Sequence, residues 1–324
     1  MSRYLLTGAA GFIASKVAEF LLADGHAVVG LYNLNEAYDV RLKHWRLQQL
    51  TGRPGFEFHP VDICDRPALE ALWDRFNTFD AVINLAARAG VRYSVENPWV
   101  YLDTNVTGTL NLLELCRTRG VNKFVLASTS SLYGAHNPLP YHEEADTSRP
   151  LSPYAASKKA AEVLCYTYHH LYRLDVTVFR YFTVYGPAGR PDMSLFRFVQ
   201  WISEGRPVTI FGDGQQSRDF TYVDDIARGT IAGLKPLGYA VVNLGSDQPV
   251  VLMDALRFVE QQIGRPAQLV FQPPHPADVP ATWADVSRAG ALLGWAPQVG
   301  HEQGIQNLIA WYRANREWAR EINT

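Results

Sequence analysis

The sequence predicts an α/β protein built on a doubly wound parallel sheet, with a smaller carboxy-terminal α/β lobe. Short apolar runs rich in β-branched residues alternate with longer segments in which apolar residues recur at helical spacing, such as residues 12–23 and 108–118. The short runs are apolar at nearly every position, which is typical of strands that helices cover on both faces. In chain order, the expected strands are residues 4–7, 27–31, 56–61, 81–85, 124–128 and 176–180.

The character of the chain changes after Gly186, where proline and glycine punctuate shorter elements. We therefore expect residues 1–185 to form the main domain and residues 186–324 to form mainly the smaller lobe. One strand of the second half, residues 240–244, is expected to return to the main sheet. Doubly wound folds bind ligands at the carboxyl ends of their strands, so the smaller lobe should cover the site.

Composition narrows the classes of function. The 324 residues include 30 Lys and Arg against 32 Asp and Glu, with a formal net charge of −2. This balance argues against nucleic-acid and membrane-surface partners. No apolar run reaches the roughly 18 residues of a membrane span, and no cleavable signal precedes the first strand. The cysteines, Cys64, Cys116 and Cys165, suit neither a disulfide framework nor a metal site, so we expect a reducing, cytoplasmic location.

A glycine turn directly after the first strand predicts a dinucleotide site. Gly8 permits a tight turn, Gly11 lets the backbone approach a pyrophosphate, and Ala14 allows close packing of helix and sheet. The helix that begins at Phe12 and Ile13 offers amide donors and the positive end of its dipole to the phosphates. The alternative is an ordinary turn between strand and helix, but the strand–turn–helix context is that of a Rossmann dinucleotide site.

The end of the second strand departs from this pattern. Such sites carry an acidic residue there for the ribose hydroxyls, whereas this chain has Tyr32 and Asn33. These side chains can still hydrogen-bond a ribose, but no carboxylate repels a 2′-phosphate, so we expect NAD and leave NADP open. Asp62, followed by Ile63 after the third strand, is a candidate partner for the adenine amino group. Alternatively, Asp62 caps a helix that begins near residues 64–67.

Two groups of polar residues predict a chemical centre. Ser152 and Pro153 are a typical helix start, which places Tyr154 and Lys158 four residues apart on one helix face. Upstream, hydroxyl residues at 128–131 follow the fifth strand, where side chains can reach a substrate. Taken alone, the first group also fits an amphipathic helix with an exposed lysine, and the second fits ordinary turn chemistry.

Together with the glycine turn, these motifs resemble the extended short-chain dehydrogenase/reductase superfamily. Further segments resemble the UDP-glucuronate 4-epimerases along nearly the whole chain. They are NLAARAGVRYS at 84–94, RYFTVYGP at 180–187, GRPDM at 189–193, RDFTYVDD at 218–225 and DVPATWAD at 278–285. The first and fourth are widespread in nucleotide-sugar enzymes, whereas GRPDM and DVPATWAD are more particular to uronate epimerases.

This resemblance implies that Tyr154 is the acid/base, Lys158 its electrostatic partner and the anchor of the nicotinamide ribose, and Thr129 the hydroxyl that shares the C4 proton. Lowering the pKa of a tyrosine by about three units from about 10 requires roughly 4 kcal/mol of preferential phenolate stabilisation. Lys158 and the positive nicotinamide ring could supply it together. Asn105 is implied near the cofactor, or alternatively is a buried amide that orders a loop. The residues expected to bind NAD are Gly8, Gly11, Phe12, Ile13, Tyr32, Asn33, Asp62, Ile63, Leu85, Ala86, Ala87, Asn105, Ser128, Tyr154, Lys158 and Tyr181.

A uronate substrate imposes a chemical constraint, because its 4-keto form is a β-keto acid that readily loses the C6 carboxylate. An epimerase must therefore hold this carboxylate out of alignment with the ketone. Thr183 and Arg190 are the candidates, since the planar fork of arginine suits a carboxylate. Ser130 and Ser131 could add hydrogen bonds. Alternatively, Arg190 forms a surface salt bridge within its loop.

The Ser130-Ser131 pair also separates the possible reactions. Related dehydratases carry Asp-Glu there and UDP-xylose-forming decarboxylases typically carry Ser-Glu, whereas this chain has neither carboxylate. The resemblance therefore implies conversion of UDP-glucuronate to UDP-galacturonate without net redox or decarboxylation. The alternatives are a UDP-hexose (glucose/galactose) 4-epimerase, a UDP-glucuronate decarboxylase, and a dinucleotide-binding sensor without catalysis. A sensor has no need of the Thr129, Tyr154 and Lys158 set.

The same resemblance implies that the UDP group binds to the second half of the chain. Arg218 would bind the diphosphate, Asp278 the uridine ribose, and Thr209 and Phe211 the uracil edge. Many UDP-sugar epimerases have an arginine three residues before this aspartate, whereas here the position is His275. Diphosphate binding must therefore depend on Arg218 or on another group.

Arg88 and Arg92 lie beside the expected sites without an assigned role, and structural pairing with Glu96 or Asp103 is the alternative. The family resemblance also implies a homodimer, usually formed through a bundle of helices. The apolar residues on the relevant helices are Leu110, Leu112, Leu113, Leu164 and Tyr168. Burial inside the monomer explains them equally well.

Overall fold

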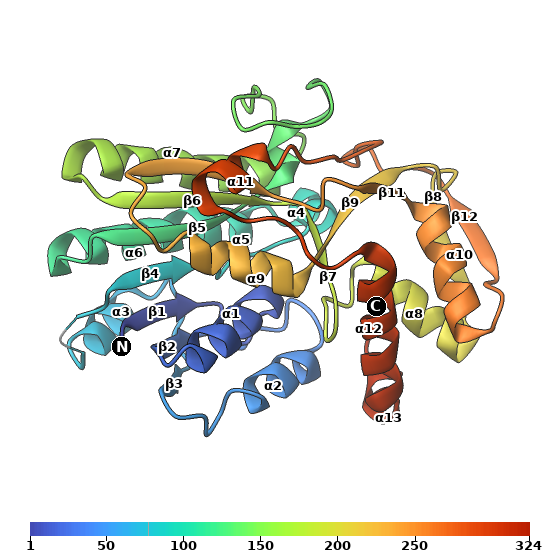
Figure 1. Ribbon diagram of the computed structural model, residues 1–324, viewed down its shortest axis with the longest axis horizontal. Coiled ribbons are helices and arrows are strands. Elements are labelled where there is room, and N and C mark those ends of the chain that lie inside the picture. The colour runs from blue at the N-terminus through green and yellow to red at the C-terminus, as the bar shows by residue number, and fades with distance from the viewer. Residues whose placement is uncertain (77) are drawn as a thin grey trace.

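A parallel sheet of seven strands forms the centre of the computed structural model, which describes residues 1–76 and 78–324 (Figure 1). Its strand order is β10-β6-β5-β4-β1-β2-β3, and every pairing in it is parallel. The strands are β1 (Arg3–Thr7), β2 (Ala27–Leu31), β3 (Phe56–His59), β4 (Ala81–Asn84), β5 (Lys123–Thr129), β6 (Asp175–Tyr181) and β10 (Tyr239–Leu244).

This sheet confirms the predicted fold class. Each predicted strand lies in it, including the strand near residues 240–244, which pairs with β6. The bounds differ by one or two residues, since β3 ends at His59 and β5 extends to Thr129. The strand order reverses between β1 and β4, because β1 pairs with both β2 and β4. In a doubly wound sheet this switch point opens a crevice at the carboxyl ends of the strands.

Helices cover both faces of the sheet, so consecutive strand residues are buried on opposite sides. In β1, Leu5 packs into the cluster beneath one set of helices and Leu6 into the cluster beneath the other. The helices on the Leu6 side are α1 (Phe12–Ala23), α9 (Val223–Ala232) and α11 (Ser287–Leu293). Those on the Leu5 side are α3 (Arg66–Trp73), α6 (Gly108–Arg119) and α7 (Pro153–Tyr172).

The start of α7 follows from local sequence. The Ser152 hydroxyl accepts a hydrogen bond from the backbone N–H of Ala155 at 3.2 Å, and Pro153 occupies the first turn. The other helices and turns of the first half of the chain are α2 (Val40–Gln48), α4 (Val91–Glu96), α5 (Trp99–Leu102), a π-helical turn η1 (Asp103–Thr107) and a 3₁₀ turn η2 (Ser130–Tyr133).

A second group of elements gathers beyond one end of the sheet (Figure 1). It has its own apolar core, in which Phe198, Ile210, Leu256 and Leu308 are buried together. Its strands form the sheets β11-β9-β7 and β12-β8. The elements are β7 (Thr183–Tyr185), α8 (Ser194–Glu204), β8 (Val208–Phe211), β9 (Ser217–Tyr222), β11 (Pro249–Val251), α10 (Leu252–Ile263), β12 (Leu269–Gln272), α12 (His301–Ala314) and α13 (Arg316–Ala319).

The second half of the chain also contributes to the main layers, because α9 and α11 pack on the sheet and β10 pairs within it. The boundary at residues 185 and 186 stays a prediction. Cys116 and Cys165 are buried, and Cys64 is half-buried. Among the helices of the described residues, none combines the length and the apolar character that crossing a membrane requires. Residues 1–76 and 78–324 also hold no group of three potential His, Cys, Asp or Glu metal ligands.

Candidate active site

A cleft of about 780 Å³ lies at the carboxyl ends of the central strands and is closed on its other side by elements of the second half. Of the predicted cofactor residues, those that border it are Gly8, Gly11, Phe12, Ile13, Tyr32, Leu85, Ala86, Ala87, Ser128, Tyr154, Lys158 and Tyr181. All the predicted substrate residues border it, namely Thr129, Ser130, Ser131, Thr183, Arg190, Thr209, Phe211, Arg218 and Asp278. Both groups therefore share one cleft.

The glycine turn after β1 has the geometry of a phosphate cradle. Gly8 has φ +76°, and a Cβ there would lie 2.9 Å from the backbone of Leu85 and Ala86. A Cβ on Gly11 would lie 2.7 Å from the Gly8 carbonyl oxygen. No side chain caps α1, so its first amides stay available to an anion at the cleft. This arrangement fits a dinucleotide pyrophosphate.

Tyr32, Asn35 and Tyr38 border the cleft where an acid was expected, and the buried Lys43 lies behind them, donating to the Asn35 carbonyl. The Lys43 ammonium lies 5.4 Å from the centre of the Tyr32 ring and 4.4 Å from that of Tyr38. Burial and the neighbouring Arg46 and Arg88 charges lower the pKa of Lys43 to about 8. Among the described residues, the cleft at this place therefore presents the hydroxyl groups of Tyr32 and Tyr38 and the amide of Asn35, and no carboxylate, to a ribose.

Asn33, Asp62, Ile63 and Asn105 are not among the described residues that border the cleft. Asn33 donates to the Asp62 carboxylate at 2.7 Å, and Asp62 also accepts from the Cys64 backbone at 2.8 Å. The alternative role of Asp62 as a helix cap is wrong. Asp65 caps α3 instead, because its carboxylate accepts from the backbone N–H of the third helical residue at 3.0 Å.

Asn105 is buried in η1 and orders the loop after β4. Its side-chain amide donates to the Arg88 carbonyl at 3.0 Å and to the Ser157 hydroxyl at 2.9 Å, and it accepts from the Arg88 backbone N–H at 3.0 Å. These contacts match the alternative prediction of a loop-ordering amide. Direct binding of a cofactor by Asn105 stays a prediction.

Tyr154 and Lys158 face the cleft from one side of α7, as their four-residue spacing predicts. The Lys158 ammonium is buried and donates to the Ala127 carbonyl at 2.8 Å. Desolvation lowers the pKa of Lys158 to about 8, and the Glu162 carboxylate opposes this change. The β5 carbonyl thus holds the Lys158 ammonium at the wall of the cleft.

Desolvation raises the pKa of the Tyr154 phenol, while a hydrogen bond with Thr129 and the positive charge of Arg190 act in the opposite direction. Thr129 also donates to the Ser131 hydroxyl and accepts from the Ser131 backbone, both at 3.2 Å. The protein alone therefore favours a neutral phenol, contrary to the lowered pKa expected for the working site. A further positive charge beside the ring is needed to favour the phenolate.

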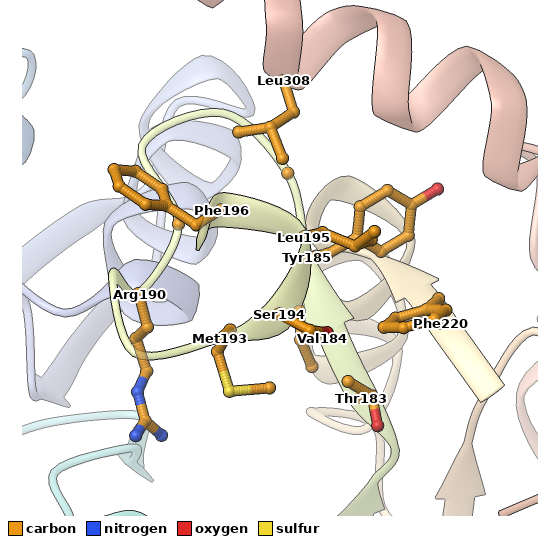
Figure 2. Close-up of a pocket in the computed structure, with 12 residues that line it drawn as sticks. Thr183, Val184, Tyr185, Arg190, Met193, Ser194, Leu195, Phe196, Phe220 and Leu308 are labelled. Carbon is orange, nitrogen blue, oxygen red and sulfur yellow. The ribbon is translucent and has the colours of Figure 1, made fainter. Parts of the chain in front are cut away.

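Arg190 borders the cleft, and its guanidinium is already engaged. It contacts both Asp192 carboxylate oxygens, at 3.1 Å through Nε and 2.5 Å through Nη2. The predicted alternative of a salt bridge within the loop is therefore present. In Figure 2, the Arg190 and Thr183 side chains extend to the same end of the small cavity that adjoins the cleft. Arg190 brings positive charge to the site, but Asp192 occupies the fork that a bidentate contact would need.

Asp278 and Phe211, which are expected to bind the uridine, both contact Arg92, an arginine to which the sequence assigned no role. The Arg92 guanidinium forms an ion pair with Asp278 at 2.7 Å and lies 3.9 Å from the centre of the Phe211 ring. The alternative pairing of Arg92 with Glu96 or Asp103 is wrong. Likewise, Arg88 donates to the Asn35 side chain at 3.2 Å.

His275 is not among the described residues that border the cleft, and its Nδ1 accepts from the Ala277 backbone at 3.1 Å. Arg218 donates to the Ser217 carbonyl at 2.8 Å and borders the cleft. Arg92, from the first half of the chain, thus provides the positive charge beside Asp278 that the His275 position lacks.

Sequence reasoning missed Arg197 and Tyr101. Arg197 borders the cleft from α8, and its buried Nε has no hydrogen-bond partner among the described residues. The Tyr101 ring packs edge-on against Tyr154, with 6.0 Å between centroids. The amphipathic pattern of α8 does not indicate a role for Arg197, because a charged residue on such a helix is expected on the solvent-exposed face. An aromatic at position 101 similarly reads as core.

The reversed strand order, the glycine cradle and the Tyr154–Lys158 pair on a shared cleft define a dinucleotide-binding enzyme of the short-chain dehydrogenase/reductase type. Comparison with known families makes this more specific. The chain belongs to the NAD dependent epimerase/dehydratase family, which residues 4–245 match.

Relatives and solved structures resemble the chain over nearly its whole length. A UDP-glucuronate 4-epimerase of Thermodesulfobacterium geofontis is 55% identical over 323 residues, covering 99% of each chain. The crystal structure of a UDP-glucuronic acid 4-epimerase from Bacillus cereus, in complex with UDP-glucuronic acid and NAD, superposes with a TM-score of 0.90. That structure is 36% identical and covers 97% of this chain and 99% of its own. A UDP-glucose 4-epimerase of Thermotoga maritima with UDP-glucose is 30% identical, with a TM-score of 0.89 and coverage of 97% and 99%.

Proposed function

We propose that this protein is an enzyme that catalyses the NAD-dependent 4-epimerisation of UDP-glucuronate to UDP-galacturonate through a 4-keto intermediate. The 55% identical UDP-glucuronate 4-epimerase supports the substrate assignment. The observation that carries the reaction type is the position of Ser130 and Ser131. These hydroxyls border the same cleft as Tyr154 and Lys158, at a place where elimination or decarboxylation would call for a carboxylate.

The glycine cradle and the residues that line its end of the cleft would hold NAD. Bound NAD would supply a hydride acceptor and then a hydride donor for C4 of the sugar, so that the reaction has no net redox change. The amides of the first turn of α1 would bind its pyrophosphate, since Gly8 and Gly11 leave room for close approach. Tyr32 and Asn35 would face its adenosine ribose.

Tyr154 would take the proton of the C4 hydroxyl as hydride leaves C4, and return it in the reverse step. The protein alone raises the pKa of this phenol, so the phenolate depends on Lys158 and on the positive charge of the oxidised nicotinamide. Thr129 is placed to share the proton, because it borders the same cleft as Tyr154 and acts to lower the pKa of the phenol. After the 4-keto sugar has turned over in the cleft, C4 would receive the hydride on its other face, and the C4 oxygen would receive the proton from Tyr154.

The C6 carboxylate would be held by hydroxyls rather than by a free arginine fork. Ser130, Ser131 and Thr183 border the cleft, and each can donate an O–H to an anion. Arg190 would act mainly through its charge, because Asp192 already holds its guanidinium. This arrangement would keep the carboxylate from aligning with the ketone and so suppress loss of carbon dioxide.

The diphosphate would be met by three arginines from different elements. Arg218 of β9, Arg197 of α8 and Arg92 of α4 all border the cleft. Burial lowers the pKa of both Arg197 and Arg218, and Arg92 adds to this effect by like-charge repulsion. A dianionic group between them would relieve that repulsion. Asp278, with Phe211 beside it, would bind the uridine ribose.

We also propose a homodimer, through the outer faces of α6 and α7. Leu112, Leu113 and Tyr168 belong to the monomer core, whereas Leu110 is 37% exposed. Val163 and Tyr166 on α7 add further exposed apolar surface. Exposed apolar side chains on these two helices suit contact with a second copy. The cytoplasmic location inferred from the cysteines stays a prediction.

Proton NMR of UDP-glucuronate with the purified protein and no added cofactor tests the function. We expect anomeric signals of UDP-galacturonate, and a Tyr154→Phe control without them. UDP-xylose with released carbon dioxide would instead identify a decarboxylase, and conversion of UDP-glucose alone a hexose epimerase. No conversion, even after addition of NAD or NADP, would leave only the sensor hypothesis.

A further inference from the structure

A buried ion pair lies directly behind the cleft and has no part in the mechanism above. Glu162 and Arg180 are each almost inaccessible to solvent, with 4% of either side chain exposed. Arg180 donates to both carboxylate oxygens of Glu162, at 3.0 Å through Nε and 2.9 Å through Nη2. Burying such a pair costs desolvation energy, so stability alone is a weak reason for it.

The pair connects the elements that carry the proposed catalytic groups. Glu162 is one turn after Lys158 on α7, and Arg180 belongs to β6. The Ser128 hydroxyl of β5 donates to Glu162 at 2.6 Å, and Arg180 also donates to the Tyr133 hydroxyl of η2 at 3.1 Å. Ser128 also borders the cleft, and because its hydroxyl proton is donated to Glu162, its oxygen can act toward a ligand only as an acceptor.

Glu162 is the carboxylate that acts on Lys158 from one turn further along α7. Its ammonium donates to the uncharged Ala127 carbonyl of β5, and its hydroxyl and amide neighbours carry no charge. Residues four apart on a helix have Cβ atoms about 5–6 Å from each other, so the Glu162 carboxylate is close. The titratable and charged groups around Lys158 are Tyr154, Lys159, Glu162 and Cys165 on α7, Arg180 on β6, Tyr101 on α5, the exposed Asp103 on η1, and Arg190, which acts on Tyr154.

We infer that Glu162, held in place by Arg180, is a positioning residue that keeps the Lys158 ammonium charged and fixes the Ser128 hydroxyl on the cleft wall. The inference rests on the proposed function, in which a charged Lys158 supports the Tyr154 phenolate. Without a carboxylate at position 162, burial would favour a neutral Lys158 at neutral pH, consistent with the opposing effects of burial and Glu162 on its pKa.

The chain is well suited to a direct test, because it has few lysines. They are Lys16, Lys43, Lys123, Lys158, Lys159 and Lys235. Lysine labelled with ¹³C at Cε therefore gives few signals, and the Lys158→Arg variant assigns the one of interest. The pKa of Lys158 can then be followed in the holoenzyme without any substrate.

Two variants remove the Glu162 charge in different ways. Glu162→Gln keeps the shape but leaves Arg180 unpaired, whereas Glu162→Gln/Arg180→Met removes both charges and protects folding. The matched control is Asp175→Asn, which removes the carboxylate of the Lys123–Asp175 pair at the opposite end of β5 and β6, where the two charged atoms are 2.5 Å apart.

We expect the pKa of Lys158 to fall by about one unit in Glu162→Gln, by less in Glu162→Gln/Arg180→Met because the positive charge of Arg180 is removed as well, and to stay unchanged in Asp175→Asn. The basic limb of the kcat–pH profile should shift to lower pH by the same amount as the pKa of Lys158. The variants should therefore lose more of their kcat at pH 9 than at pH 6.5. An unchanged Lys158 titration in a folded variant would overturn the inference, as would an equal loss of kcat at every pH. Failure of both variants to fold would assign the pair a structural role only. If the wild type does not epimerise UDP-glucuronate, the proposed function fails while the titration still decides this inference.

Discussion

Arg197 gives a quantitative test of how the cleft binds the diphosphate. It is half-buried on α8, it borders the cleft, and its buried Nε has no hydrogen-bond partner among the described residues. Much of its desolvation cost is therefore incurred before a ligand arrives. We expect Arg197→Met, which preserves most of the side-chain volume, to weaken binding of UDP-glucuronate.

The magnitude follows from the kind of contact that is lost. A hydrogen bond to a charged group contributes about 1.5–3 kcal/mol, and more than one guanidinium hydrogen can reach a phosphate. The lower figure corresponds to a rise of roughly tenfold in KM and the upper to roughly 150-fold. Because the diphosphate does not change during epimerisation, the loss should fall on KM and leave kcat within about twofold.

Two measurements check this expectation. Initial rates followed by NMR give KM and kcat for UDP-glucuronate, and calorimetric titration with UDP gives the affinity for the part that does not react. Arg206→Met is the control, because Arg206 is exposed and donates to the Arg320 carbonyl away from the cleft. A change in KM of less than threefold, or a fall in kcat at constant KM, would refute the role of Arg197 in diphosphate binding.

Other predictions address the chemistry and the stability of the fold. Tyr154→Phe should fold and retain cofactor but lose at least about 10³-fold in kcat, as measured by NMR turnover; activity near that of the wild type would exclude Tyr154 as the acid/base. Ser152→Ala removes the cap of α7, whose hydroxyl accepts from Ala155, and should cost about 1 kcal/mol in urea unfolding, whereas Ser152→Asp should restore it. Arg316 holds the pKa of Glu204 below its usual value, so this contact stabilises the fold above the unfolded-state pKa of about 4.3 and is lost as pH falls through the lower folded-state value. Glu204→Gln should therefore destabilise the protein at pH 7 by about 1–2 kcal/mol, with a deficit that narrows below pH 4 in thermal unfolding; a deficit independent of pH would contradict this account.

The cofactor end shows where local chemistry was enough and where it was not. The turn of Gly8 and Gly11 was predictable, because a positive φ and close backbone approach select glycine whatever surrounds them. The position of Asp65 as the cap of α3 was missed in favour of Asp62, since both precede the helix and only the backbone path decides between them. The role of Asn105 was likewise not decided by local sequence, because its hydrogen bonds go to the backbone of Arg88 in the loop after β4.

The central sheet, the glycine cradle and the start of α7 could all be predicted from local sequence. Apolar periodicity, turn residues and helix caps act over a few neighbouring residues, so a single chain records them. Only the tertiary structure decided that Arg92 pairs with Asp278, that Asp192 occupies Arg190, and that Arg180 holds Glu162. The first and third of these contacts join segments far apart in the chain, and their partners are selected by the packing of helices and strands. All three arginines carry the same charge, and their different roles come from the burial and the neighbours that the fold gives each of them.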